Sequence, residues 1–498
     1  MTTLDADTLD RAPDTDQAFH IETHGVDHIP AAERWARPRD LAGMWAGASF
    51  NVEYLVYGAI LMGFGFTFTQ TLILIVVGNL SWFLVGLTSL QGPQSGTTTF
   101  GSNRAAFGPR GSKILAAFNW LTMIGFETMG LILIVGASLI LCEHAGLAVS
   151  NGLKVGLVVG AVAIQAILPV LGHATIVKVL RWLIAPFIAI YVALLVTSWS
   201  HVHTSLAPEH GATWQLWTAG LAFSFVLAGL SWTECGNDYS RYLPEDASPK
   251  GIVGWVFMAT ALPQMLLMAL GALLLTAVGA TFEVWNGSNP FEAINRASFL
   301  PAWFIVLFCA ITILQLFAIN SLDLYSSGVT LQALGLRVKR YQAVLLDSVI
   351  CLGVTLYAVL SSSFSTYLKD FVGLVIIWIA PWCAIYLVDW LLRKRRYEPL
   401  QLQVTDATSA YWAQGGYNVP ALIAQLLGMV ACLIGLNTAF TIPDWLHPLV
   451  VATESDPASG AFSGSDFSIP LGMGVAALSY WVLMALTTRR KRRKAAAA

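Results

Sequence analysis

Residues 221–244 read LAFSFVLAGLSWTECGNDYSRYLP, and this stretch decides the fold. Residues 221–230 are apolar enough to lie in lipid, but from Ser231 the chain turns polar and carries the carboxylate of Glu234. Gly229 and Gly236 free backbone groups that need partners inside the protein or in a water-filled cavity. An interrupted membrane helix with a carboxylate is how many secondary transporters expose polar groups to a substrate. We therefore interpret this stretch as half of a binding site.

The composition indicates a membrane protein. Hydrophobic residues make up 56% of the 498 residues and charged residues only 11%, against roughly 25% charged in soluble domains. Runs of about 20 apolar residues predict membrane helices. Twelve candidate spans lie near 43–67, 70–91, 114–142, 154–172, 180–199, 214–235, 252–280, 302–327, 343–361, 371–392, 418–440 and 468–488.

The positive charges support this count. With a cytoplasmic N-terminus, 24 of the 27 Lys and Arg residues fall on the cytoplasmic side, and Lys154, Arg296 and Lys369 are the exceptions. This distribution follows the positive-inside rule. We expect cytoplasmic tails at 1–40 and 489–498, with no cleaved signal peptide because the first 40 residues lack an apolar core. Short loops favour the plasma membrane of a bacterium, its inner membrane.

The first span resembles the sixth in its pattern. Residues 40–53 read DLAGMWAGASFNVE, with small and polar residues inside an apolar run. We expect this helix to break at Asn51, Val52 and Glu53, although a hydrated membrane surface would also explain the polar front half. Two such helices five spans apart are typical of inverted repeats. We expect repeats over 41–200 and 214–392, with two further helices over 418–488.

Two other spans carry polar residues. In span 3, Trp120, Glu127 and Gly130 share one helix face. A carboxylate deep in a span costs about 2.5 to 3.5 kcal/mol, so Glu127 acts on a substrate or proton, or takes part in a structural pair. In span 8, Asn320 and Asp323 lie three residues apart and face one side, where they could bind a planar ligand; a solvated helix end explains Asp323 almost as well.

Several other classes of site are disfavoured. Residues 91–111 are rich in Gly and Pro, which predicts a tight cytoplasmic re-entrant turn or a short surface helix. No Gly-Lys-Ser/Thr follows and no strand precedes, so this is not a phosphate loop. The six cysteines show no paired spacing, and we expect no disulfide framework, metal site or cofactor. His201, His203 and His210 fit a solvated loop better than a zinc site.

Residues 238–244, DYSRYLP, resemble the hallmark after the sixth helix of the nucleobase:cation symporter-1 family, which contains purine and cytosine permeases and their allantoin and hydantoin relatives. Residues 45–51 resemble the start of the family's first helix. Residues 92–108, with Arg104, resemble its loop between helices 2 and 3, and residues 320–327 its eighth helix. The similarity covers residues 40–340 in order.

This resemblance implies an all-α, twelve-helix, leucine-transporter-type fold with a 5+5 inverted repeat, alternating access and cation-driven uptake of a nucleobase-like heterocycle. It implies a ring stacked between aromatic residues of helices 3 and 6, with polar contacts from helices 3, 6 and 8. The positions implied here are Phe126 or Trp120, then Gly229, Ser231 and Trp232, and then Asn320 and Asp323. Relatives place Gln or Asn where this chain has Gly130, which leaves Glu127 as the nearest polar candidate.

We therefore predict a symporter, not an enzyme, whose partners are a heterocycle, a coupling cation and the lipid bilayer, with no nucleic acid. Sodium-coupled relatives use helix 8 hydroxyls, but residues 314–319 contain none and Thr312 lies too early, so we favour a proton. The candidates to carry the proton are Glu127, Glu53, Glu234 and Asp323. The alternatives are sodium coupling, or an amino-acid or amine carrier on the same fold. An enzyme would need a metal site or a nucleophile with its base, and a sensor a large soluble domain.

Overall fold

The computed structural model describes residues 27–167, 173–205, 211–278, 291–336, 340–361, 364–436 and 465–497. Every regular element in these ranges is a helix. The longer helices are α1 (Asp40–Ser49), α2 (Val52–Gly63), α3 (Phe68–Asn79), α4 (Trp82–Ser89), α8 (Gly111–His144), α9 (Asn151–Gln165), α11 (His173–Ser198), α12 (Trp214–Ala228), α14 (Pro249–Val278), α17 (Ala302–Ala333), α18 (Arg340–Ser361), α19 (Phe364–Leu392), α21 (Val419–Gly435) and α22 (Ser468–Ala497).

Short helices connect them. The α-helical connections are α5 (Gln91–Ser95), α6 (Thr99–Ser102), α7 (Arg104–Phe107), α13 (Gly236–Ser240), α16 (Glu292–Asn295) and α20 (Pro399–Gln403). The 3₁₀ helices are η2 (Ala31–Glu33), η3 (Trp199–His201) and η4 (Leu230–Cys235).

Nine helical stretches in the described ranges are long and apolar enough to cross a membrane. They are Phe68–Ser95, Gly111–His144, Trp182–His201, Trp214–Ser240, Pro249–Val278, Ala302–Ala333, Gln342–Ser361, Phe371–Leu392 and Ser468–Arg489. The shorter apolar helices α2, α9 and α21 overlap the other three predicted spans, near 43–67, 154–172 and 418–440. The prediction of a multi-pass helical protein is confirmed, whereas the number of twelve crossings stays a prediction.

Large apolar side chains are exposed on the outside of the helical body, and a set of polar residues is buried within its largely apolar interior. Large apolar residues on several helices are exposed, among them Leu121, Val196, Leu345, Leu426 and Leu478. Buried polar residues include Asn51, Glu127, Asn237, Asn320 and Asp389. This distribution suits lipid outside and a polar, functional interior.

Glycines bring the central helices into close contact. A Cβ at Gly58 of α2 would lie 1.9 Å from the Met268 carbonyl oxygen of α14, and a Cβ at Gly271 of α14 would lie 1.8 Å from the Leu55 carbonyl oxygen of α2. Small residues that let backbones approach are typical of helix interfaces in membranes. The α2–α14 contact therefore depends on these two glycines.

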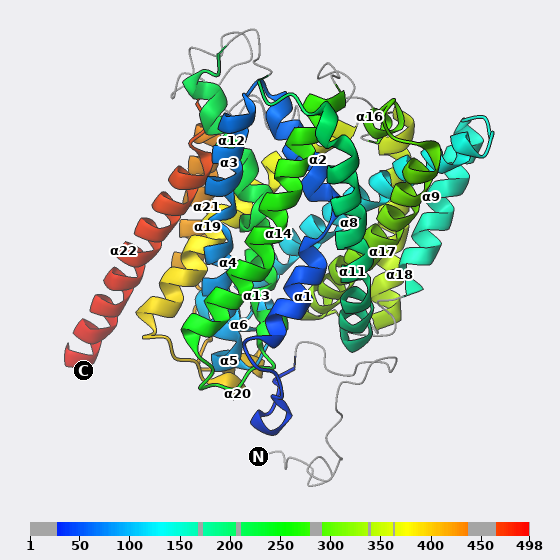
Figure 1. Cartoon of the computed structure of the whole chain (residues 1–498). Coiled ribbons are helices and arrows are strands. Elements are labelled where there is room, and N and C mark those ends of the chain that lie inside the picture. Colours follow the sequence, from blue (N-terminus) through cyan, green and yellow to red (C-terminus); the bar gives the residue numbers. More distant parts are fainter. Residues whose placement is uncertain are drawn as a thin grey trace.

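The terminal helices lie at defined places in the helical body. Figure 1 shows the start of α1 and the end of α22 on the same side, with α22 along one edge and α9 and α18 along the opposite edge. α22 continues through the basic residues 489–494 to Ala497, so the predicted tail begins as a helix. Residues 437–464, between α21 and α22, lie outside the described ranges, and so does His210.

Candidate binding site between two broken helices

The first helix is interrupted between α1 and α2. α1 ends at Ser49 and α2 begins at Val52, and the backbone of Asn51 is extended, with φ −128° and ψ 138°. The Asn51 side chain caps α2 by accepting from the Glu53 N–H at 3.1 Å. The interruption thus falls on Phe50 and Asn51, while Val52 and Glu53, which we expected within the break, form the first turn of α2.

The sixth helix is interrupted after Gly229, where α12 ends and η4 begins. The Gly229 N–H donates to Ser81 Oγ at 2.7 Å, and a Cβ at Gly229 would lie 2.5 Å from the Trp82 nitrogen. The Trp232 ring stacks on Trp82, with centroids 6.3 Å apart, and meets Trp45 edge-on at 5.9 Å. This second break is therefore packed against α4 and α1.

Four buried carboxylates lie around and between the two breaks. Asp323 of α17 is close enough to Glu53 of α2, Glu127 of α8 and Glu234 of η4 for their charges to interact. Within the described ranges, none of the four forms an ion pair with Lys or Arg. The Glu53 carboxylate accepts from the Tyr57 hydroxyl at 3.4 Å. Like charges without a cationic partner are costly in a low-dielectric interior, so this centre suits a proton or a cationic ligand.

Unpartnered polar atoms point to where a ligand would be recognised. Ser231 Oγ, Glu234 Oε2, Asn320 Oδ1 and Glu127 Oε1 are buried and have no hydrogen-bond partner in the described part of the chain. Buried polar groups are rarely left unpaired in native proteins. These four atoms come from η4, α17 and α8, three of the elements from which we expected polar contacts.

Trp120 and Glu127 both contact α18. Trp120 Nε1 donates to Asp347 Oδ1 at 2.7 Å, and Ser327 Oγ donates to Asp347 Oδ2 at 2.6 Å. One turn further along α18, Cys351 Sγ donates to Glu127 Oε2 at 3.3 Å. The two α8 residues therefore share a face, and this face is packed against another helix.

Gly130 makes room for Asn320. A Cβ at Gly130 would lie 2.1 Å from Asn320 Oδ1. Asn320 Nδ2 donates to the backbone carbonyl of residue 127 at 3.1 Å and to Gln165 Oε1 on α9 at 3.0 Å. Phe126, the other aromatic candidate, meets the Phe371 ring of α19 edge-on, with centroids 4.8 Å apart. The candidate residues of α8 therefore do not face one common neighbour, but contact three different helices, α17, α18 and α19.

Residues 238–241, DYSR, connect the second break to the loop between α4 and α8, which contains α5, α6 and α7. The Thr99 N–H donates to Asp238 Oδ1 at 2.9 Å. Asn237 Nδ2 donates to Ser102 Oγ at 2.9 Å and to the Tyr386 hydroxyl at 2.8 Å. The short helices α5, α6 and α7 of this loop are buried. Of the two alternatives predicted over 91–111, the short surface helix was wrong, because these polar partners satisfy the loop inside the protein.

The N-terminal segment before α1 packs on the same loop. Arg34 Nη1 donates to the Pro93 carbonyl at 2.6 Å, the Ile29 N–H donates to the Gly96 carbonyl at 2.8 Å, and His28 Nδ1 lies 3.3 Å from the carbonyl oxygen of residue 95. Burial, and then the charge of Arg34, lower the pKa of His28 from its ordinary value of 6.5. The docked segment therefore favours a neutral His28 ring.

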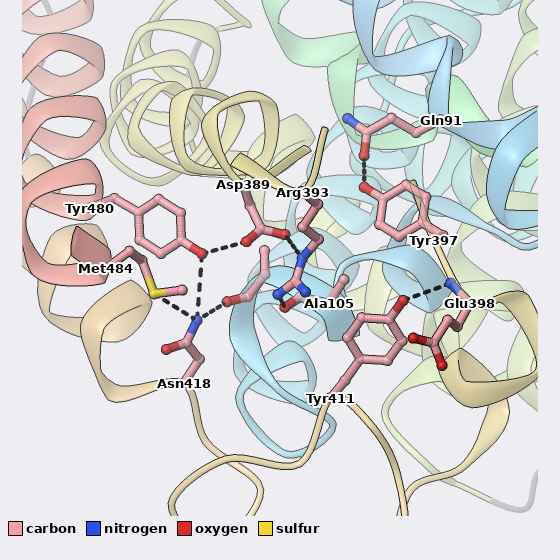
Figure 2. Close-up of polar contacts among 11 residues, drawn as sticks. Gln91, Ala105, Asp389, Arg393, Tyr397, Glu398, Tyr411, Asn418, Tyr480 and Met484 are labelled. Carbon is pink, nitrogen blue, oxygen red and sulfur yellow. Dashed lines mark hydrogen bonds and ion pairs between the residues drawn. The ribbon is translucent and has the colours of Figure 1, made fainter. Parts of the chain in front are cut away.

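A polar cluster attaches α22 to the rest of the bundle, as Figure 2 shows. Asp389 Oδ2 accepts from Arg393 Nε at 2.6 Å, and Asp389 Oδ1 accepts from the Tyr480 hydroxyl at 2.6 Å. Arg393 Nη2 also donates to the Ala105 carbonyl at 2.6 Å. Burial alone would lower the pKa of Arg393, but the charge and hydrogen bond of Asp389 raise it above the ordinary value. Asn418 completes the cluster through the Tyr480 hydroxyl at 3.5 Å.

Sequence reasoning did not single out Gln315, Asp347 or Asp389. Each is buried within a predicted apolar span and bonded to another helix. The signal that could have found them is a polar side chain inside an apolar run, because such residues are costly in a membrane and need partners.

Two interrupted helices packed together in a multi-pass helical bundle, with carboxylates that have no ion-pair partner among the described residues, are the architecture of a secondary transporter. Residues 28–456 match the profile of a family described as permeases for cytosine/purines, uracil, thiamine and allantoin, and the chain belongs to this family. The nucleobase:cation symporter-1 resemblance is thereby confirmed.

Two relatives that align with most of the chain support this family assignment. It is 26% identical over 486 residues to the putative purine-cytosine permease YxlA of Bacillus subtilis, covering 93% of this chain and 96% of the relative. It is 22% identical over 477 residues to the purine-cytosine permease fcyB of Emericella nidulans, covering 93% and 88%.

Solved structures show the same fold. Mhp1, a nucleobase-cation-symport-1 family transporter solved in a closed conformation with bromovinylhydantoin bound, superposes with a TM-score of 0.72 at 17% identity over 94% of this chain and 96% of Mhp1. The inward-facing conformation of Mhp1 gives 0.70 over the same shares of the two chains. The expected leucine-transporter-type fold is confirmed.

Proposed function

We propose that this transporter imports a nucleobase or a related neutral heterocycle together with a proton. Both relatives are described as purine-cytosine permeases, which supports the substrate class. The observation that carries the coupling is the group of four buried carboxylates without an ion-pair partner in the described ranges. One proton moving inward down a potential of about 100 mV supplies about 2.3 kcal/mol, or roughly fiftyfold accumulation.

The ring would lie near the two breaks and be read at its edge. We assign stacking to Trp232 with Phe126 or Trp120, because flat rings offer large apolar contact on both faces. Polar contacts fall to Gly229, Ser231, Asn320 and Asp323, with Gly130 as the position that sets the available space. The buried, unpartnered atoms of Ser231 and Asn320 support this assignment.

The proton would be carried by the carboxylates around Asp323. Glu53 of α2 and Asp323 of α17 interact electrostatically, and a proton on either would remove the repulsion between them. Glu127 and Glu234 are the other candidates. Glu127 accepts a bond from Cys351 and lies at the α8–α18 contact, which gives it a structural partner that Glu234 Oε2 lacks among the described residues.

The carboxylate hypothesis is tested with Glu53→Gln, Glu127→Gln, Glu234→Gln and Asp323→Asn in proteoliposomes. Loss of the proton carrier should abolish accumulation under an imposed proton gradient yet allow exchange of labelled for unlabelled substrate, because exchange needs no net proton movement. Asp466→Asn is the matched control, since Asp466 is a buried carboxylate that accepts two hydrogen bonds from Ser468 at the start of α22. Unchanged accumulation in all four variants would contradict the proposal.

The same carboxylates favour a second candidate, a cationic heterocycle or amine. A positively charged substrate would itself neutralise this centre and would need no proton. Competition separates the two proposals: a permanently charged compound such as thiamine should displace labelled substrate only in the second case.

We also propose how the protein lies in the membrane. Both termini are cytoplasmic, the two repeats cover 41–200 and 214–392, and the location is the plasma membrane.

A further inference from the structure

The side chain of Gln315 on α17 forms hydrogen bonds with the backbone on both sides of the interruption between α1 and α2. Gln315 Nε2 donates to the Phe50 carbonyl, which precedes Asn51. The Val52 N–H, which follows Asn51, donates to Gln315 Oε1 at 2.9 Å. A single amide therefore satisfies one acceptor and one donor on the two sides of the interruption.

The surroundings fix the orientation of this amide. Gln315 Oε1 also accepts from the Tyr191 hydroxyl of α11 at 2.5 Å, and Gln315 is only 2% exposed. Turning the amide over would set its NH₂ group against the Val52 N–H, donor against donor. Gln315 thus connects the broken first helix to both α17 and α11.

Backbone carbonyls freed at a broken helix are where transporters of this architecture coordinate their coupling ion. Here an amide N–H of Gln315 donates to the Phe50 carbonyl, so this freed carbonyl already has a hydrogen-bond donor. Residues 314–319 of α17 offer no hydroxyl as a further ligand. Thr312, the hydroxyl nearest to Gln315 along α17, is buried and lies three residues before it.

We propose that the Gln315 side chain replaces a metal cation at the first-helix break and ties this break to α17 and α11 through a neutral, built-in contact. Gln315 is then a positioning residue of the transport cycle, and no sodium ion is needed to order the break. This inference rests on the proposed function, because it states which kind of ion does not couple transport.

The test is hydrogen–deuterium exchange of the substrate-free full-length protein in lipid nanodiscs. We expect the amides of residues 52–54 to exchange at the same rate with and without about 0.15 M sodium. In Gln315→Leu, which keeps the size but not the hydrogen bonds, the Val52 amide should exchange at least about tenfold faster, the loss of one net hydrogen bond. Slower exchange of these amides in sodium, or an unchanged rate in Gln315→Leu, would overturn the proposal.

Gln425 of α21 provides the matched control. It is a buried glutamine whose Nε2 donates to the Trp378 carbonyl of α19 at 2.9 Å, and Gln425→Leu should leave residues 52–54 protected. Gln315→Met gives an independent reading if the leucine variant does not fold, because methionine is unbranched like glutamine but cannot donate to the Phe50 carbonyl and is only a weak acceptor for the Val52 N–H. The Val52 amide should again exchange at least about tenfold faster in Gln315→Met and at the wild-type rate in Gln425→Met.

Failure of this inference and failure of the proposed function are separable. Exchange is measured without substrate, so a protein that takes up no nucleobase would still report on the break. Sodium-stimulated nucleobase uptake together with sodium-protected residues 52–54 would overturn the Gln315 proposal while leaving the substrate class intact.

Discussion

Asp389 of α19 links α22 to the bundle through its hydrogen bond with Tyr480. It accepts two charge-assisted hydrogen bonds, from Arg393 Nε and the Tyr480 hydroxyl, each 2.6 Å long. Such a bond contributes about 1.5 to 3 kcal/mol and a neutral one about 1 kcal/mol. Asp389→Asn leaves one acceptor oxygen for the two donors and removes the ion pair, and the Arg393 side chain is 29% exposed, which screens the lost ion pair. We expect the free energy of unfolding to fall by about 2 kcal/mol.

The assay is denaturant titration of the purified protein in mixed micelles, with Tyr480→Phe and the double variant completing a cycle. Because both residues share one bond, the two losses should overlap by about 1 kcal/mol rather than add. Tyr357→Phe is the control, since Tyr357 is 70% exposed and its change should stay within about 0.5 kcal/mol. Additive losses, or a loss for Asp389→Asn as small as the control's, would refute the reasoning.

Two further predictions concern packing and pH. Gly271→Val should prevent α14 from docking on α2, because its Cβ would lie 1.8 Å from the Leu55 carbonyl oxygen; size-exclusion chromatography should show no folded peak, whereas Gly254→Ala, with nothing within 4 Å of its Cβ, should elute normally. Burial and then Arg34 lower the pKa of His28 below 6.5, so its contribution to docking is complete above about pH 6.5 and is lost as the pH falls through the lower, folded value. Exchange of residues 28–36 should therefore accelerate at acidic pH in the wild type and not in His28→Asn; equal acceleration in both would contradict the role of His28.

Much of the fold could be predicted from the sequence because its signals are local. Apolar runs gave the membrane helices, and the polar residues after Gly229 predicted that the sixth helix would be interrupted, as α12 and η4 are. The first break was predicted at residues 51–53 but lies at residues 50–51. Phe50 is apolar and gives no sign of a break in the sequence. The polar Glu53 suggested one, but the Asn51 cap places it in the first turn of α2.

The contacts within the candidate site depend on tertiary packing, which periodicity does not encode. The shared face of Trp120 and Glu127 follows from their spacing, but only the structure places it against Asp347 and Cys351. The search of residues 314–319 for hydroxyl ligands passed over Gln315, because its importance lies in two backbone groups about 265 residues away along the chain. The assignment of substrate and proton to individual residues stays a prediction.

Proton coupling of heterocycle uptake is the central claim, and uptake into proteoliposomes with a proton gradient and a sodium gradient imposed separately tests it most directly. A radiolabelled panel of cytosine, uracil, hypoxanthine, allantoin and hydantoin covers the substrate class. We predict that at least one of these compounds accumulates under the proton gradient alone, and that the sodium gradient alone drives none. Accumulation that requires sodium would contradict proton coupling, and no uptake of any heterocycle would contradict the substrate class.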